Sequence, residues 1–95
     1  MKPLRATKYC EIWKRGILQE DDDMHAIEKI KVKSTGNFEV QFAFYKKREE
    51  NQLQFVSRPL DLSEEILLEL FEVAKDQKIL SDKFFDDLKG IIDRV

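Results

Sequence analysis

The side chains best suited to chemistry are an acidic run, Asp21 to Asp23, and the single histidine, His25. Carboxylate oxygens bind hard cations, and imidazole suits transition metals. Consecutive residues of a loop cannot all turn toward one ion, however, and the run lacks the spaced carboxylates of a calcium loop. The pattern favours a solvated acidic loop over Gln19 to His25. We therefore expect no metal site and no cofactor.

The single cysteine, Cys10, is the other candidate nucleophile. A catalytic cysteine or serine needs a base such as His25 beside it. Cys10 lies in an apolar alternation typical of a small buried residue, and Ser63 and Ser81 suit helix caps. The three glycines are scattered, so no glycine-rich phosphate loop exists. We expect a protein that is not an enzyme and has no catalytic residue.

The elements that must position these residues follow from a change of apolar spacing near Pro59. Before it, apolar residues recur at every second position, as at Phe38 and Val40. After it they recur every three to four, as at Leu67 and Leu70. These periods are typical of strands and amphipathic helices. The sequence predicts an α+β fold: a three- to four-stranded antiparallel meander with a C-terminal antiparallel helix pair packed on one face.

Residues 1–95 are expected to form a single α+β domain, with residues 1–58 mainly sheet and 59–95 a helical hairpin. Ser63 and Ser81 resemble N-caps, because acidic residues follow each in the first turn. The first helix is expected to end near Asp76. A short connector then predicts that the two helices are antiparallel neighbours.

Residues 4–18 fit both a strand and one face of a helix. Their aromatic and β-branched content favours a strand that ends at Gly16. Residues 26–33 and 38–45 alternate clearly, and Ser34 to Asn37 between them has turn chemistry. Residues 52–58 alternate again, and Pro59 ends the sheet.

The apolar residues of 38–44 are expected to face the helices, because both helical stripes must be buried. Lys29, Lys31 and Lys33 alternate with Ile30 and Val32, so we expect these lysines to point away from the helices. The predicted core comprises Ile30, Val32, Phe38, Val40, Phe42, Phe44, Leu53, Phe55, Leu67, Leu70, Phe71, Ala74, Phe84, Leu88, Ile91 and Ile92.

The outer face of the sheet is the candidate binding surface, since aromatic residues and cations should meet there. Three interpretations fit: a protein interface rich in hot-spot residue types, an ordinary half-solvated sheet, and a stacking platform for single-stranded nucleic acid. The first is favoured, because the acidic chain, with a pI near 5.5, opposes a polyanion. The candidate residues are Tyr9, Trp13, Lys29, Lys31, Lys33, Tyr45 and Arg58.

The charge and composition of the chain narrow the classes of partner that we expect. The net charge of −2 divides into +3 over residues 1–58 and −5 over residues 59–95. No segment reaches the ~18 apolar residues of a membrane span, and the first residues lack an apolar signal region. We expect a small cytoplasmic binding or adaptor protein of microbial or phage type, with a protein partner and a possible homodimer. A nucleic-acid-binding module is the alternative, and a membrane partner is not expected.

Overall fold

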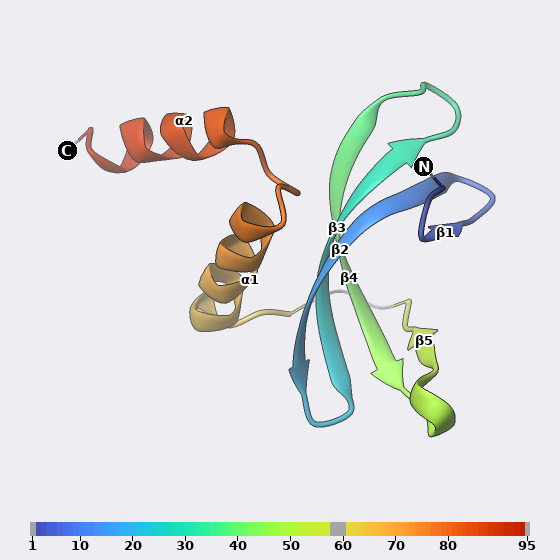
Figure 1. Ribbon diagram of the computed structural model, residues 1–95. Coiled ribbons are helices and arrows are strands. Elements are labelled where there is room, and N and C mark those ends of the chain that lie inside the picture. The colour runs from blue at the N-terminus through green and yellow to red at the C-terminus, as the bar shows by residue number, and fades with distance from the viewer. Residues whose placement is uncertain (1, 58–60, 95) are drawn as a thin grey trace.

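The computed structural model describes residues 2–57 and 61–94. Within them, five strands form one antiparallel sheet in the order β1-β2-β3-β4-β5, followed by two helices (Figure 1). The α+β class and the meander order are confirmed, although the strand count is higher than expected. The elements are β1 (Arg5–Ala6), β2 (Cys10–Glu20), β3 (Asp23–Val32), β4 (Phe38–Lys47), a 3₁₀ turn (Glu49–Asn51), β5 (Leu53–Phe55), α1 (Glu64–Asp76) and α2 (Asp82–Ile92).

Strand β2 is longer than expected, because it continues through Gly16 to Glu20. The strand interpretation of residues 4–18 is confirmed by β1 and β2, but the expected end at Gly16 is wrong. A Cβ atom at Gly16 would lie 2.4 Å from Val73 Cγ1 of α1. Gly16 therefore permits the close approach of α1 to the middle of the sheet.

The acidic run forms a tight hairpin turn and not a loop over residues 19–25. Glu20 pairs with Asp23 across the turn, and Asp21 adopts a positive φ of 55°. Aspartate tolerates this left-handed conformation better than most residues. The turn before β4 follows expectation, with Gly36 at a φ of 75°. Pro59, expected to end the sheet, lies outside the described residues.

The register between β3 and β4 corrects the expected face of the β3 lysines, whereas the apolar residues of β4 lie on the side of α1 as expected. Lys29 pairs with Val40, and Lys31 pairs with Phe38. Directly paired residues point to the same face of a sheet, so these lysines accompany the apolar residues of β4. Alternation within a strand shows which residues share a face, but it does not show how two strands are matched. We call the face that α1 covers the helix-side face and the opposite one the far face.

Helix α1 packs on β2 and β3, where Leu70 and Ala74 bury themselves against Ile27. Its cover stops short of β4: Phe44 is 2% exposed, but Phe38, on the same strand, is 54% exposed. Much of the expected core is consequently wrong, because the single helix α1 contacts mainly β2 and β3 of the five strands. The expected core residues that are exposed are Phe38, Val40, Phe42, Phe55, Leu67, Phe84, Ile91 and Ile92.

Helix α2 begins at its Ser81 cap as expected, with the Ser81 hydroxyl accepting from the Phe84 N–H. It does not return along α1, and Figure 1 shows it extending away from the sheet. No residue of α2 is buried. The expected antiparallel packing is wrong because Lys78, at a φ of 58°, turns the chain and Ile79 anchors the connector in the core beneath α1.

The far face carries a second apolar layer in two clusters. Cys10, Ile12 and Ile30 form one, and a group centred on Ala26 and Tyr45 forms the other. Cys10 is buried, as its apolar alternation predicted, and Ile12 is buried beside it. In the described part of the chain, neither helix has the length and apolar character needed to cross a membrane.

Candidate functional site

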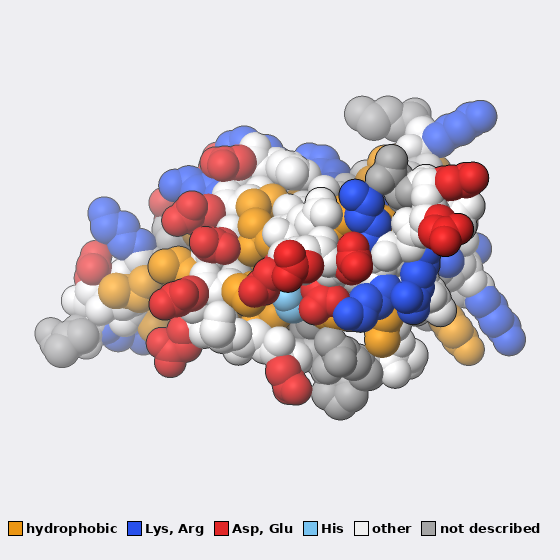
Figure 2. Space-filling view, turned by 90° about the horizontal axis from the view of Figure 1, so that it is seen from below, with side chains coloured by type: hydrophobic (Ala, Val, Ile, Leu, Met, Phe, Trp, Pro, Cys, Tyr) orange, Lys and Arg blue, Asp and Glu red, His pale blue; other side chains and the backbone are white. Residues whose placement is uncertain are grey.

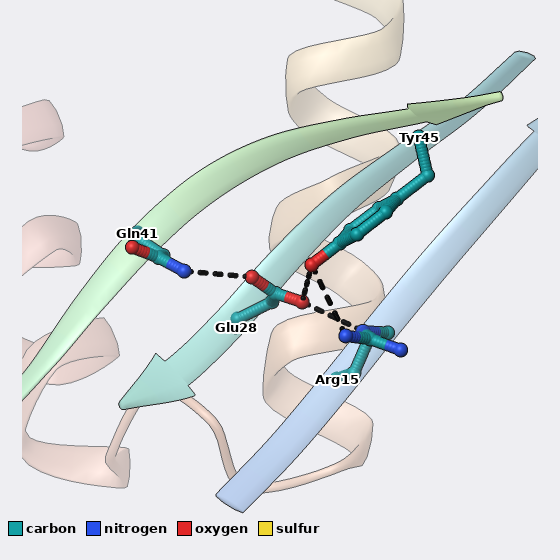
Figure 3. Close-up of polar contacts among 4 residues, drawn as sticks. All are labelled: Arg15, Glu28, Gln41 and Tyr45. Carbon is teal, nitrogen blue, oxygen red and sulfur yellow. Dashed lines mark hydrogen bonds and ion pairs between the residues drawn. The ribbon is translucent and has the colours of Figure 1, made fainter. Parts of the chain in front are cut away.

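A buried carboxylate, Glu28, lies at the centre of the far face with no exposed surface (Figure 3). Its Oε2 atom accepts hydrogen bonds from Arg15 Nε at 2.6 Å and from the Tyr45 hydroxyl at 2.7 Å. Its Oε1 atom accepts one from Gln41 Nε2 at 2.8 Å. The donors come from β2 and β4 on either side of β3, so Glu28 joins three strands.

The charges in this polar cluster are matched. Arg15 Nη2 donates to the Tyr45 hydroxyl at 3.1 Å, and the guanidinium carbon lies 4.7 Å from the centre of the Tyr45 ring. Burial and the hydrogen bond donated to Glu28 raise the pKa of Tyr45 to about 12. Burial alone would lower the pKa of Arg15, but its contacts with Glu28 and Tyr45 outweigh this and raise it. The cluster therefore holds an ion pair and a neutral phenol.

A β-bulge explains how Arg15 reaches Glu28. Ile12 pairs with Ile30 and Lys14 with Lys29, so Trp13 is the extra residue of β2. The bulge shifts the alternation by one position, which places Ile12 and Arg15 on the same face. Glu28 itself is closed to solvent, and each of its oxygens has a donor. The cluster is consequently suited to joining strands and not to receiving a substrate.

Beside the cluster, the far face contains a groove of about 550 Å³. Tyr9 and Phe55 line it with exposed side chains, and Gln41 connects it to the polar cluster. Arg5 supplies a cation at its edge. The groove is mainly apolar, as small-molecule sites usually are.

The helix-side face carries a different surface, which we call the helix-side patch: Trp13, Lys29, Lys31, Phe38 and Val40. The Phe38 ring is the centre, with the Lys29 and Lys31 ammonium groups 5.1 and 5.8 Å from its centroid. Trp13 packs edge-on against it at 6.4 Å between centroids. The patch is thus an exposed aromatic ring between cations.

A hollow of about 310 Å³ separates the patch from the start of α2. Phe38, Val40 and Lys29 form one wall, while the connector after α1 and Phe84 form the other. Phe84 is 38% exposed, although it contacts Phe71 at 6.1 Å between ring centroids. The hollow is apolar between two partly exposed phenylalanines.

The structure brings together only part of the expected binding surface. Trp13, Lys29 and Lys31 meet at the helix-side patch. Tyr45 lies on the far face and is 2% exposed, so it is not available to a partner there. The register of β3 against β4 is the physical reason for the separation, because it places the lysines on the helix-side face and Tyr45 on the far face.

The remaining expected residues lie elsewhere. Tyr9 is 74% exposed and lines the far-face groove. Lys33 is exposed just beyond β3, and its N–H donates to the Tyr9 carbonyl at 3.0 Å. Arg58 lies outside the described residues.

The acidic turn and His25 do not form a metal centre. Among residues 2–57 and 61–94, no three histidine, cysteine or acidic side chains are placed to hold an ion. Asp23 forms an ion pair with Lys46. His25 is 8% exposed and packs edge-on against Phe44, with its Nε2 atom 3.9 Å from Glu20. Figure 2 shows acidic side chains gathered around the histidine on this face.

Sequence reasoning missed the polar cluster of Arg15, Glu28 and Gln41. One signal was present, since Glu28 alternates with Ala26 and Ile30 on an otherwise apolar face. A carboxylate in that position is buried only when paired. Its partners could not be named, because the bulge at Trp13 and the strand registers choose them.

Comparison of this chain with models of protein families, with curated proteins and with solved structures gives no significant match to any of them.

Proposed function

We propose that the protein is a small, non-catalytic binding or adaptor protein of the cytoplasm that acts through protein–protein contacts at the helix-side patch. The observation that carries this proposal is the 54% exposure of Phe38, beside the 41% exposure of Val40. Isolated exposed apolar residues are common, but a cluster with polar surroundings is typical of an interaction surface.

The composition of the patch supports a protein partner. An aromatic centre between cations matches the hot-spot pattern, in which a few large side chains carry the binding energy. The edge of the sheet is a further support. Among the described residues, β5 pairs only with Tyr45 to Lys47 of β4. The preceding part of β4, which carries Phe38, is thus open to strand pairing.

The direct test compares the wild-type protein with the Phe38→Asp variant, each tagged and isolated from its native host. A partner bound in stoichiometric amount to the wild type should be lost from Phe38→Asp, because a carboxylate in a desolvated contact is strongly unfavourable. Leu4→Asp is the matched control, since Leu4 is 62% exposed outside the patch. The same partners on wild type and Phe38→Asp would contradict the proposal.

A nucleic-acid-binding module is the second candidate. The placement of Lys29 and Lys31 around the exposed Phe38 ring favours it, because bases stack on aromatic rings while lysines contact phosphates. The acidic balance of the chain, −2 overall, opposes it. We rank it below the protein partner for that reason.

Filter binding with mixed-sequence single-stranded RNA and DNA separates the two candidates. Combined change of Lys29, Lys31 and Lys33 to Gln should flatten the slope of log affinity against log salt by about two units if these lysines contact phosphates. Micromolar binding that weakens steeply with salt and is lost in this variant would replace the protein-partner proposal. Absence of such binding removes the second candidate.

A further inference from the structure

Among the exposed apolar surfaces of the described residues, two are suited to cover each other. One is the helix-side patch on the sheet. The other is the apolar stripe of α2, where Ile91 is 60% and Ile92 is 62% exposed. The sheet surface is broad and the α2 surface is a ridge, which is the usual match between a sheet face and a covering helix.

The chain cannot join these surfaces within one copy in the observed arrangement. Ile79 is 4% exposed and anchors the connector in the core beneath α1. The Ile79 N–H donates to the Ala74 carbonyl at 2.8 Å, closing the end of α1. From this fixed point α2 leads away from the sheet (Figure 1). An isolated helix of 11 residues is marginal in water, so α2 needs a cover.

We propose that α2 of one copy packs on the helix-side patch of a second copy, and the reverse, in a twofold-symmetric dimer. This inference rests on the proposed function, because it names the partner of the same patch. Exchange of an element between identical chains is a low-cost route to a closed dimer. Formation of this dimer would cover the helix-side patch and the apolar stripe of α2 in both copies.

Charge supports a second copy as the occupant. Residues 82–93 contain four aspartates and two lysines, a balance of −2. The patch presents Lys29 and Lys31, and neither has an ion-pair partner in the part of the chain that the structure describes. In the dimer, the acidic helix α2 would thus lie against the apolar side chains of the patch, with Lys29 and Lys31 beside them. Such complementarity favours this pairing over sheet against sheet, which would bring the lysines of two copies together.

The size of the surfaces is adequate for a weak dimer. A phenylalanine can bury ~150–250 Å² when fully covered. Phe38 of the patch is 54% exposed, and Phe42, which lies beside the patch on the same face of β4, is 44% exposed. Added to the α2 stripe and doubled by symmetry, the contact approaches, from below, the ~1,200 Å² at the lower end of specific interfaces. We therefore expect a dissociation constant in the micromolar range.

Light scattering of the purified protein at tens of micromolar should give twice the 11.3 kDa mass of one chain. Phe38→Asp and Ile91→Asp should each give the monomer mass. Each substitution occurs in both contacts of the dimer, so we expect more than a hundredfold loss of affinity. Leu68→Asp is the matched control, because Leu68 is 62% exposed on α1 outside both surfaces. Circular dichroism confirms that each variant remains folded, and Val40→Asp repeats the sheet substitution at a second position.

Mixing the two monomeric variants provides the decisive step. The Phe38→Asp chain keeps an intact α2, and the Ile91→Asp chain keeps an intact patch, so the mixture can form one of the two contacts. The mass should rise on mixing, and it should not rise for either variant alone. A monomeric wild type, a dimer that resists Ile91→Asp, or a mixture that stays monomeric would each overturn the proposal. A Phe38-dependent partner found in the host would still stand in those cases, so failure of the dimer is distinct from failure of the proposed function.

Discussion

The molecule divides into a body, formed by the sheet and α1, and an arm formed by α2. Both helices are amphipathic and begin at a serine cap, Ser63 or Ser81, whose hydroxyl accepts a backbone N–H. Helix α1 nevertheless buries Leu70 and Ala74, whereas α2 buries nothing. Local sequence therefore determines where a helix forms. Whether the helix buries its apolar face depends on a second surface that it can pack against. Gly16 provides that surface for α1.

The largest expected difference concerns the ion pairs of the two regions. Glu28→Ala should lower the free energy of unfolding by about 3–5 kcal/mol, because it leaves the Arg15 charge partly buried without its partner. Lys83→Ala removes the exposed Lys83–Asp87 pair of α2 and should cost less than about 1 kcal/mol. Urea denaturation of both variants measures the difference. Similar losses would mean that the cluster is more open to water than its geometry indicates.

Truncation of apolar side chains gives the second contrast. Leu70→Ala should cost about 2–5 kcal/mol, since Leu70 has no exposed surface and leaves a cavity. Ile91→Ala, measured in solution dilute enough for the monomer, should change stability by less than about 0.5 kcal/mol. Thermal unfolding at low concentration compares them. A large loss from Ile91→Ala there would show that α2 packs within its own chain.

Replacement of Gly16 and of Gly90 by alanine should change the stability of the protein in opposite directions. Gly16→Ala should destabilise the protein by about 1–3 kcal/mol, because its Cβ would meet Val73 at 2.4 Å and push α1 outward. Gly90→Ala should stabilise it by up to about 1 kcal/mol, since nothing lies within 4 Å and alanine favours a helix. Combining Gly16→Ala with Val73→Ala tests the cause. Stability should partly return if the two side chains collide.

The smallest effect concerns the Tyr45 hydroxyl, whose contribution to stability should change in alkaline solution. Tyr45→Phe should cost about 1 kcal/mol at neutral pH, because it removes the hydrogen bond donated to Glu28 and the one accepted from Arg15. The pKa of Tyr45 rises from 10.0 to about 12 in the fold, so the neutral phenol stabilises the protein below pH 10. That contribution is lost as the pH rises from 10 toward 12. The stability difference between wild type and Tyr45→Phe should therefore shrink over this interval, and a constant difference would contradict the assignment.

Much of the fold could be predicted from local pattern. The hairpin over β3 and β4, both serine caps and the end of α1 at Asp76 follow from alternation, turn chemistry and helix signals. These features depend on residues close in the sequence. The register of Lys29 against Val40 depends instead on two strands meeting, and alternation carries no information about it.

The candidate site was harder to predict for the same reason. Trp13, Lys29 and Lys31 were named from residue type, and they do meet, but around Phe38 and not around Tyr45. Phe38 was assigned to the core because both helices were expected to cover the sheet. The direction of α2 depends on Lys78 and Ile79, whose turn no period in the sequence marks. Burial of Phe44 was predicted correctly, and its ring packs edge-on against His25 of the neighbouring strand β3.

The anchoring of Ile79 also determines how the protein opens locally. Amide protons of β2 and β3 should exchange with solvent only when the whole body unfolds, whereas those of α2 are held by an 11-residue helix without buried side chains. The boundary of the cooperative unit thus falls at Ile79, and hydrogen exchange beyond it is governed by local fraying. A second copy packed on α2 would suppress that fraying. The exchange rates of the α2 amides should therefore fall as the protein concentration rises and the dimer forms, while those of the sheet amides should not change.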